Sequence, residues 1–246
     1  MSASESKCFV FAGPTLNCGE AKIFDRVSGV RILPPVERGD IRKLIEAQRR
    51  RGVIAMVDGV FHQALAVGHR EIRDAVDRGW EIWGLASMGA IRAYEMRDLG
   101  VQGFGRVYRC FFEHEDFRDD EVAVLHEPGP PFRNFSEPLV HVRFWLTALV
   151  DDGHIDRRQE QAILNDLTSL WFGHRTMERI RAAAMKVVPF QREIIESTLG
   201  DFHRYRVKCR DLSDFLEEQP WRRKVSRRRG KIVELRSTGR NAASAR

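Results

Sequence analysis

Two unbroken apolar runs, residues 53–57 and 82–86, organise the first part of the chain. Such runs are typical of parallel strands that are buried on both faces. Each run ends in a turn and is followed by a segment with a helical apolar period, so residues 53–99 alternate strand, helix, strand, helix. This alternation predicts an α/β fold with a mostly parallel open sheet flanked by helices.

Shorter apolar runs extend this pattern on both sides. We expect strands at residues 8–12 and 30–33, a short extended piece at 107–112, and a last strand at 122–125. A helix then begins after Ser136, which we interpret as its cap, and ends near Gly153.

From residue 156 onward the apolar period is helical only. Asp156 and Gln159 have the spacing of a capping box, and the period is lost beyond Trp221. We therefore expect an α/β domain at residues 1–155, a helical extension at 156–220, and a basic disordered tail at 221–246.

The chain of 246 residues carries a formal net charge of +6, and much of the excess lies in the tail. A basic tail can contact nucleic acid or an acidic protein. No recognition motif accompanies this charge, and blocks of like charge are typical of solvated ends, so we expect no nucleic-acid partner.

Neither a membrane span nor a secretion signal is recognisable. No apolar run approaches the roughly 18 residues that a spanning helix needs. The first residues are polar and lack an apolar signal core. We expect a cytoplasmic protein without a membrane partner.

The four cysteines are scattered, and they form no C-x-x-C pair. We expect reduced thiols and no zinc site, because no H-x-x-x-H or clustered Cys/His spacing occurs either. A persulfide relay through Cys18 or Cys110 has no motif to support it. A phosphate-binding Walker A loop is also missing, so we expect neither a metal nor a cofactor.

Ser87 is the sharpest candidate for chemistry. It lies in Ser87-Met88-Gly89, between an apolar run and the helix that follows. Hydrolases present a nucleophilic serine on such a strand-to-helix turn, where backbone N–H groups can hold an oxyanion and a glycine such as Gly89 keeps the turn uncrowded. The G-x-S-x-G motif is incomplete, because Leu85 stands at its first glycine. The alternative is that Ser87 is a helix N-cap.

Asp58 and His69 are candidate partners of this serine. Asp58 ends the run at residues 53–57, and the carboxyl ends of parallel strands meet at one edge of a sheet. His69 begins the next helix and can act as general base, with Asp58 or Glu71 orienting it. The alternatives are a turn aspartate and a surface or capping histidine. His62 and His126 are rival bases.

Four residues are candidates for substrate binding besides Gly89. Gly13 and Thr15 lie in the turn after the first strand, where backbone can approach a ligand. Arg92 and Glu95 lie on the helix that leaves Ser87. They can bind a carboxylate, or they form a local ion pair.

Several short motifs follow one another in a fixed order between residues 10 and 150. They are Gly13-Pro14-Thr15; Pro34-Pro35 with Arg38-Gly39-Asp40; Asp58-Gly59-Val60-Phe61; Ala66-Val67 with His69-Arg70-Glu71-Ile72; Ala86-Ser87-Met88-Gly89-Ala90 with Arg92-Ala93 and Glu95; Asp119-Asp120-Glu121-Val122-Ala123-Val124 with His126; and Ser136-Glu137-Pro138-Leu139-Val140. This order resembles the TfuA-like family.

The resemblance implies a partner of a YcaO-type enzyme, a cyclodehydratase or thioamide synthetase that activates backbone amides with ATP. The family is implicated in the biosynthesis of ribosomal peptide antibiotics, including trifolitoxin, and in peptide thioamidation. The implied role is to supply sulfur from a small ubiquitin-like carrier that ends in a thiocarboxylate.

Two hypotheses follow from this resemblance. In the first, the chain is a thiocarboxylate (acyl) hydrolase: Ser87 attacks the carrier's terminal carbonyl, His69 and Asp58 assist, and sulfide leaves. The carrier tail then lies in a groove over Gly13, Asp58 and Ser87, and Arg92 meets its terminal charge. In the second, the chain is a non-catalytic adaptor that recruits the carrier or the precursor peptide to the YcaO enzyme.

Overall fold

The computed structural model describes residues 7–17, 27–60 and 65–222, and its centre is a five-stranded sheet. All strand pairs are parallel, and the order is β2-β1-β3-β4-β5. The strands are β1 (Cys8–Phe11), β2 (Val30–Leu33), β3 (Val53–Met56), β4 (Glu81–Leu85) and β5 (Gln102–Phe104). The predicted α/β class is therefore confirmed. The strand order changes direction between β1 and β3, where doubly wound sheets bind their ligands.

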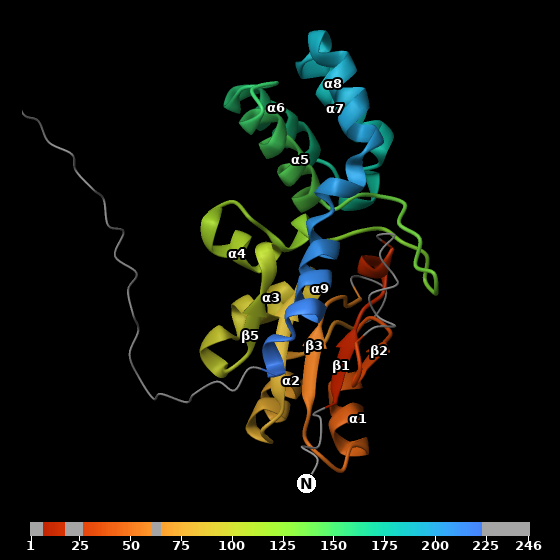
Figure 1. The fold of residues 1–246 in the computed structure, drawn as a ribbon, viewed down its shortest axis with the longest axis vertical. Coiled ribbons are helices and arrows are strands. Elements are labelled where there is room, and N and C mark those ends of the chain that lie inside the picture. The colour runs from red at the N-terminus through yellow and green to blue at the C-terminus, as the bar shows by residue number, and fades with distance from the viewer. Residues whose placement is uncertain (1–6, 18–26, 61–64, 223–246) are drawn as a thin grey trace, which may run out of the picture.

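Three helices cover one face of this sheet: α1 (Asp40–Ala47), α2 (His69–Asp77) and α3 (Met88–Glu95) (Figure 1). Alternate strand residues, among them Phe9, Ile54 and Ile82, point into this layer. Gly89 lets α3 approach the sheet, because a Cβ on it would lie 1.8 Å from the carbonyl oxygen of Met56. Gly89 therefore allows close packing between α3 and the sheet, whereas the sequence suggested that it keeps the Ser87 turn uncrowded.

The opposite face is covered by α9 (Val207–Glu218), which comes from the far end of the chain (Figure 1). Leu212, Phe215 and Leu216 of α9 pack against Val10 and Ala55 of the sheet. A parallel sheet must be buried on both faces, so α9 completes the α/β layers.

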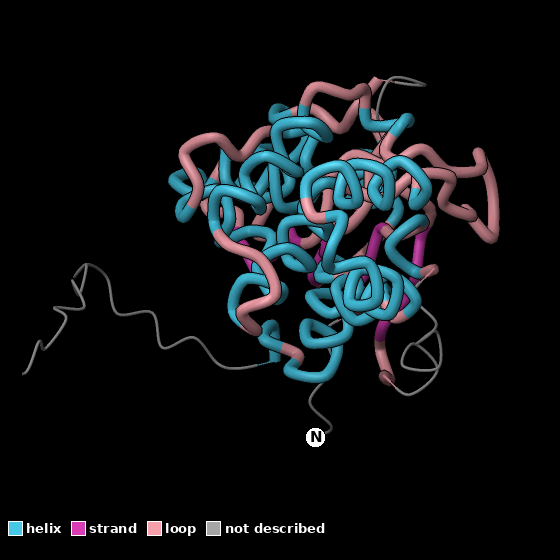
Figure 2. The backbone as a smooth tube through the Cα atoms, turned by 90° about the horizontal axis from the view of Figure 1, so that it is seen from above, coloured by secondary structure: helices cyan, strands magenta, loops and turns pink. Residues whose placement is uncertain are grey.

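The remaining helices are α4 (Gly105–Glu113), α5 (Leu139–Asp151), α6 (Arg157–Thr168), α7 (Met177–Val187) and α8 (Arg192–Gly200). Helices α5 to α8 surround a second apolar cluster, around Trp145 and Leu167, above the sheet layers of Figure 1. Seen from above, helices surround the strands (Figure 2). The capping box that begins α6 is confirmed: the Gln159 amide donates to Asp156 at 2.8 Å, and the Asp156 amide donates to Gln159 at 2.9 Å.

Short 3-10 turns connect these elements. They are η1 (Pro14–Leu16), η3 (Arg97–Leu99), η4 (Asp119–Glu121), η5 (Phe172–His174), η6 (Pro189–Gln191), η7 (Phe202–Tyr205) and η8 (Pro220–Arg222). No helix in the described ranges combines the length and apolarity required to span a bilayer. Of the residues predicted as a basic tail, Trp221 and Arg222 lie in η8, and residues 223–246 lie outside the described part of the chain.

Three local predictions are wrong. Residues 107–112 belong to α4 and not to an extended piece, because Val107 and Cys110 give the segment an inward helical face. Residues 122–125 do not form a strand; this segment crosses the carboxyl ends of the sheet. Ser136 does not cap α5, since its Oγ accepts from the Leu125 amide at 2.9 Å and Pro138 is at the N-cap.

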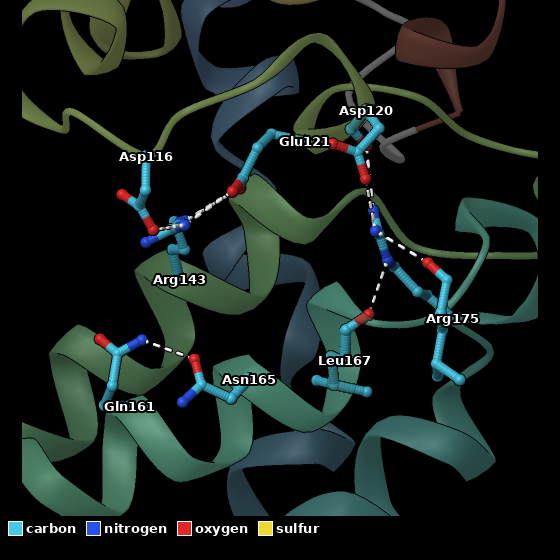
Figure 3. Close-up of polar contacts among 9 residues, drawn as sticks. Asp116, Asp120, Glu121, Arg143, Gln161, Asn165, Leu167 and Arg175 are labelled. Atoms are coloured by element: carbon cyan, nitrogen blue, oxygen red, sulfur yellow. Dashed lines mark hydrogen bonds and ion pairs between the residues drawn. The ribbon is translucent and has the colours of Figure 1, made fainter.

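Arg175 joins the helical part to the segment before residue 122 (Figure 3). Its guanidinium is fully buried and donates to the carbonyl oxygens of Leu167 at 3.1 Å, Leu170 at 3.0 Å and Asp120 at 3.0 Å. It also pairs with the Asp120 carboxylate at 2.5 Å. Arg143 makes a second such junction by donating to Glu121 and Asp116 (Figure 3).

We predict that Arg175→Met lowers the free energy of unfolding by about 3–5 kcal/mol, because it leaves buried acceptors without a donor. Denaturant unfolding of the full chain measures this. Arg179→Met is the matched control: Arg179 is 45% exposed and pairs with Asp166 at 3.3 Å, so its loss costs at most about 1 kcal/mol. Equal losses in the two variants would contradict the role assigned to Arg175.

Candidate functional site

Asp58 holds the turn after β1 to the end of β3. Its Oδ2 accepts from the Gly13 and Thr15 amides, each at 2.9 Å, and its Oδ1 accepts from the Thr15 hydroxyl at 2.7 Å. The aspartate is 2% exposed. The structure therefore brings Asp58, Gly13 and Thr15 together at the switch point of the sheet, where they bond to one another.

Ser87 lies on a strained turn between β4 and α3. Ala86 before it has a φ of +62°, a left-handed conformation that costs an L residue roughly 1–2 kcal/mol. Ser87 is at the N-cap position, yet its side chain makes no capping bond. Its hydroxyl instead donates to the Val122 carbonyl oxygen at 3.3 Å, and the residue is 3% exposed. The hydroxyl thus faces the crossing segment and is covered by it.

One backbone amide of the Ser87 turn, which could stabilise an oxyanion, already has a hydrogen-bond acceptor. The Gly89 N–H donates to the Val57 carbonyl oxygen at 3.2 Å. Stabilisation of negative charge at this turn would have to come from other donors.

His69 forms a surface cluster with Glu95 and Arg92. Its Nε2 lies 2.8 Å from the Glu95 carboxylate, which also pairs with Arg92 at 2.6 Å. Arg92 donates through Nε to the Val67 carbonyl oxygen at 3.1 Å. The local ion pair predicted for Arg92 and Glu95 is therefore present, and the histidine joins it.

The structure does not assemble Ser87, His69 and Asp58 into a triad. Each of them bonds to other partners, and Glu71, the second residue suggested to orient His69, accepts from the Gly39 and Gly68 amides. The physical reason is that both carboxylates satisfy backbone amides at element ends, a role that spacing cannot distinguish from catalysis. His126 points its Nδ1 to the Glu127 carbonyl oxygen at 2.6 Å, and His62 lies outside the described residues.

Lys208 of α9 shares the acceptor of Ser87. Its ammonium donates to the Val122 carbonyl oxygen at 3.0 Å, and the residue is 2% exposed. Burial lowers the pKa of Lys208, against the opposing charges of Asp58 and Glu137. A hydroxyl and an amine with a lowered pKa thus converge on one oxygen at the carboxyl end of the sheet.

His141 and Glu137 complete this buried polar cluster. The His141 Nδ1 lies 3.0 Å from the Glu137 carboxylate, which also pairs with Arg206. Burial lowers the pKa of His141, so the imidazole is neutral and its Nδ1–H donates to Glu137. Its Nε2 is buried without a hydrogen-bond partner among the described residues. That nitrogen is a free proton acceptor.

These buried residues differ in how far the sequence indicates them. Glu137 and His141 are four residues apart, a spacing that places two side chains on one helical face. Lys208 carries no local signal, because only the return of α9 to the sheet brings it here.

A groove opens beside this cluster. The cavity has a volume of about 980 Å³, at the upper end of the roughly 300–1,000 Å³ typical of ligand pockets. We call it the proline groove, after its lining: Ala12, Leu16, Asn17, Ile32, Leu33, Pro34, Pro35, Glu37, Val60, Val124, Leu125, His126, Pro128, Gly129, Pro130, Pro131, Phe132, Trp171 and Phe172. Its wall at Val124 continues into Val122, the acceptor of Ser87 and Lys208.

The cysteines differ from the expectation in one respect. Cys8 and Cys110 are free and buried, and burial raises the pKa of each to about 12, which disfavours a thiolate relay. Cys209 is disulfide-bonded, so the expectation of reduced thiols is wrong there, because pairing depends on tertiary contacts and not on spacing. Cys18 lies outside the described residues.

Comparison with known families identifies the core of the chain. No curated protein matches it. The family model described as TfuA-like protein matches residues 58–176, a range that includes Ser87, Glu137 and His141. Residues 58–176 of the chain therefore belong to the TfuA-like family.

Proposed function

We propose that this chain, as a member of a family that works in YcaO-associated modification systems, releases sulfide from a thiocarboxylated carrier protein for a YcaO-type enzyme. The observation that carries the proposal is the convergence of Ser87 and Lys208 on the Val122 carbonyl oxygen. The released sulfide would serve backbone thioamide formation in a ribosomal peptide.

The carrier's carboxyl-terminal tail occupies the proline groove in this proposal. The groove lies past the carboxyl ends of β1 and β2 and is lined mainly by proline, aliphatic and aromatic side chains, which suit an extended peptide. Its wall adjoins Val122. A tail that displaces this wall uncovers the Ser87 hydroxyl.

The reaction then proceeds in two balanced steps. Lys208, as a neutral amine, takes the proton of Ser87 while Oγ attacks the terminal carbonyl, and the C–S bond breaks. The proton passes to the leaving sulfur, which departs as HS⁻, and an ester on Ser87 remains. Water then cleaves the ester to the carrier carboxylate, a proton and free Ser87; the unpartnered Nε2 of His141 is an available base for this water.

The second candidate is a non-catalytic adaptor that recruits the carrier or the precursor peptide to the YcaO enzyme. It is favoured by the cover over Ser87, which is 3% exposed and is not part of the groove lining. The adaptor binds the same tail, but it performs no chemistry on it.

We predict that Lys208→Met lowers sulfide release from a thiocarboxylated carrier by on the order of 10²-fold, the range of a lost general base, and that Ser87→Ala lowers it at least as much. Methionine preserves the approximate volume of the buried lysine, and the Val122 carbonyl oxygen keeps the Ser87 hydroxyl as a donor, so the fold is retained. Lys186→Met is the control, since Lys186 is 74% exposed and pairs with Asp166, which is not one of the reacting groups named above. Sulfide release by Ser87→Ala at the parent rate, with carrier binding intact, would favour the adaptor.

We predict that Trp171→Ala weakens binding of a synthetic peptide with the carrier's tail sequence by about tenfold, because an aromatic side chain in a groove is a typical hot spot. Trp171 lines the groove and is 51% exposed, so the fold tolerates its truncation. Phe190→Ala is the matched control, since Phe190 is 97% exposed and lies outside the groove. Calorimetry with the full chain measures both affinities, and an unchanged affinity for Trp171→Ala would remove the groove from the proposal.

A further inference from the structure

Cys110, Glu113 and His114 bring three potential metal ligands together at the end of α4. The thiol sulfur, a carboxylate oxygen and a ring nitrogen all lie within 4.8 Å of one another. A spacing of three residues places Cys110 and Glu113 on one face of α4, and His114 follows at the C-cap, where the backbone is extended. We propose that they form a binding site for a divalent metal ion of the zinc class.

The three ligand atoms need to move only a short distance to bind one zinc ion. Zinc bonds of about 2.0–2.3 Å in a tetrahedron set neighbouring ligand atoms roughly 3.3–3.8 Å apart. Cys110 is 2% exposed and fixed in the core, whereas Glu113 and His114 are exposed, so the adjustment falls to their side chains. The His114 ring already stacks on Phe117, with the centroids 6.4 Å apart, which limits the orientations it can take.

The charges around the thiol favour a cation. Glu113 and Glu121 are acidic groups that act on Cys110, and Arg143 is the opposing positive group. The site also lies at the carboxyl end of α4, where unpaired carbonyl groups carry partial negative charge. When the ion binds, the thiol proton leaves to solvent and a metal–sulfur bond forms. The ion, the thiolate and the Glu113 carboxylate together are then neutral.

The donor set selects the metal. A thiolate with an imidazole suits zinc and its soft neighbours, whereas magnesium and calcium require oxygen ligands. Three protein ligands leave a fourth position for water, as in catalytic zinc sites. A search for paired cysteines or paired histidines misses this group, because each ligand type occurs once.

Titration of the full metal-free chain with Co²⁺ tests the site, because a thiolate ligand gives a charge-transfer absorption in the near ultraviolet. We expect one equivalent to bind and to be displaced by Zn²⁺. His114→Gln should weaken binding by at least about tenfold, and Cys110→Ser should remove the charge-transfer band. Cys8→Ser is the control, because Cys8 is the other buried free cysteine and lies in β1.

Three results would overturn the proposal: no charge-transfer band in the parent, a band that persists in Cys110→Ser, or an unchanged affinity in His114→Gln. Since Cys110 is in the core, thermal unfolding without metal verifies that its variant is folded. His114 is exposed, so its variant decides the question even if Cys110→Ser fails to fold.

Discussion

The structure depends on one constraint: an all-parallel sheet must be covered on both faces. Helices α1 to α3 cover one face with segments that alternate with the strands, as the chain order allows. Among the described residues, no α-helix between the strands covers the other face, and α9 does so from more than a hundred residues beyond β4. The residues between β5 and α9 therefore connect the two faces of the sheet. Within this connection, helices α5 to α8 pack around an apolar cluster of their own.

The return of α9 has consequences for chemistry as well as for packing. It carries Lys208 to the carboxyl end of the sheet and Asp211 to the first amides of α4, at 2.7 and 2.9 Å. Burial raises the pKa of Asp211 to about 7, a sign of how thoroughly α9 excludes water here. The element that seals the sheet thus also supplies the buried base of the proposed reaction.

Buried polar groups in this protein are placed where segments distant in sequence meet. Asp58 joins the ends of β1 and β3, Arg175 joins η4 to the helical part, and Glu137 joins α5 to Arg206 before α9. Each is paired, as the cost of desolvation requires. The Nε2 of His141 departs from this pattern, because it is buried without a hydrogen-bond partner among the described residues.

The sequence by itself determined the α/β class, the buried strands β1, β3 and β4, the turn at Ser87 and the capping box of α6, because each depends on local periodicity and spacing. It also indicated the family through the order of short motifs. It did not determine the partners of Asp58, His69 and Ser87, since a carboxylate at a strand end has the same local pattern whether it bonds to backbone or to a histidine. Only the tertiary structure decided that Lys208 meets Ser87 at the Val122 carbonyl oxygen. Burial of the second sheet face brings these sequence-distant segments together, and no residue near Ser87 in the chain encodes that meeting.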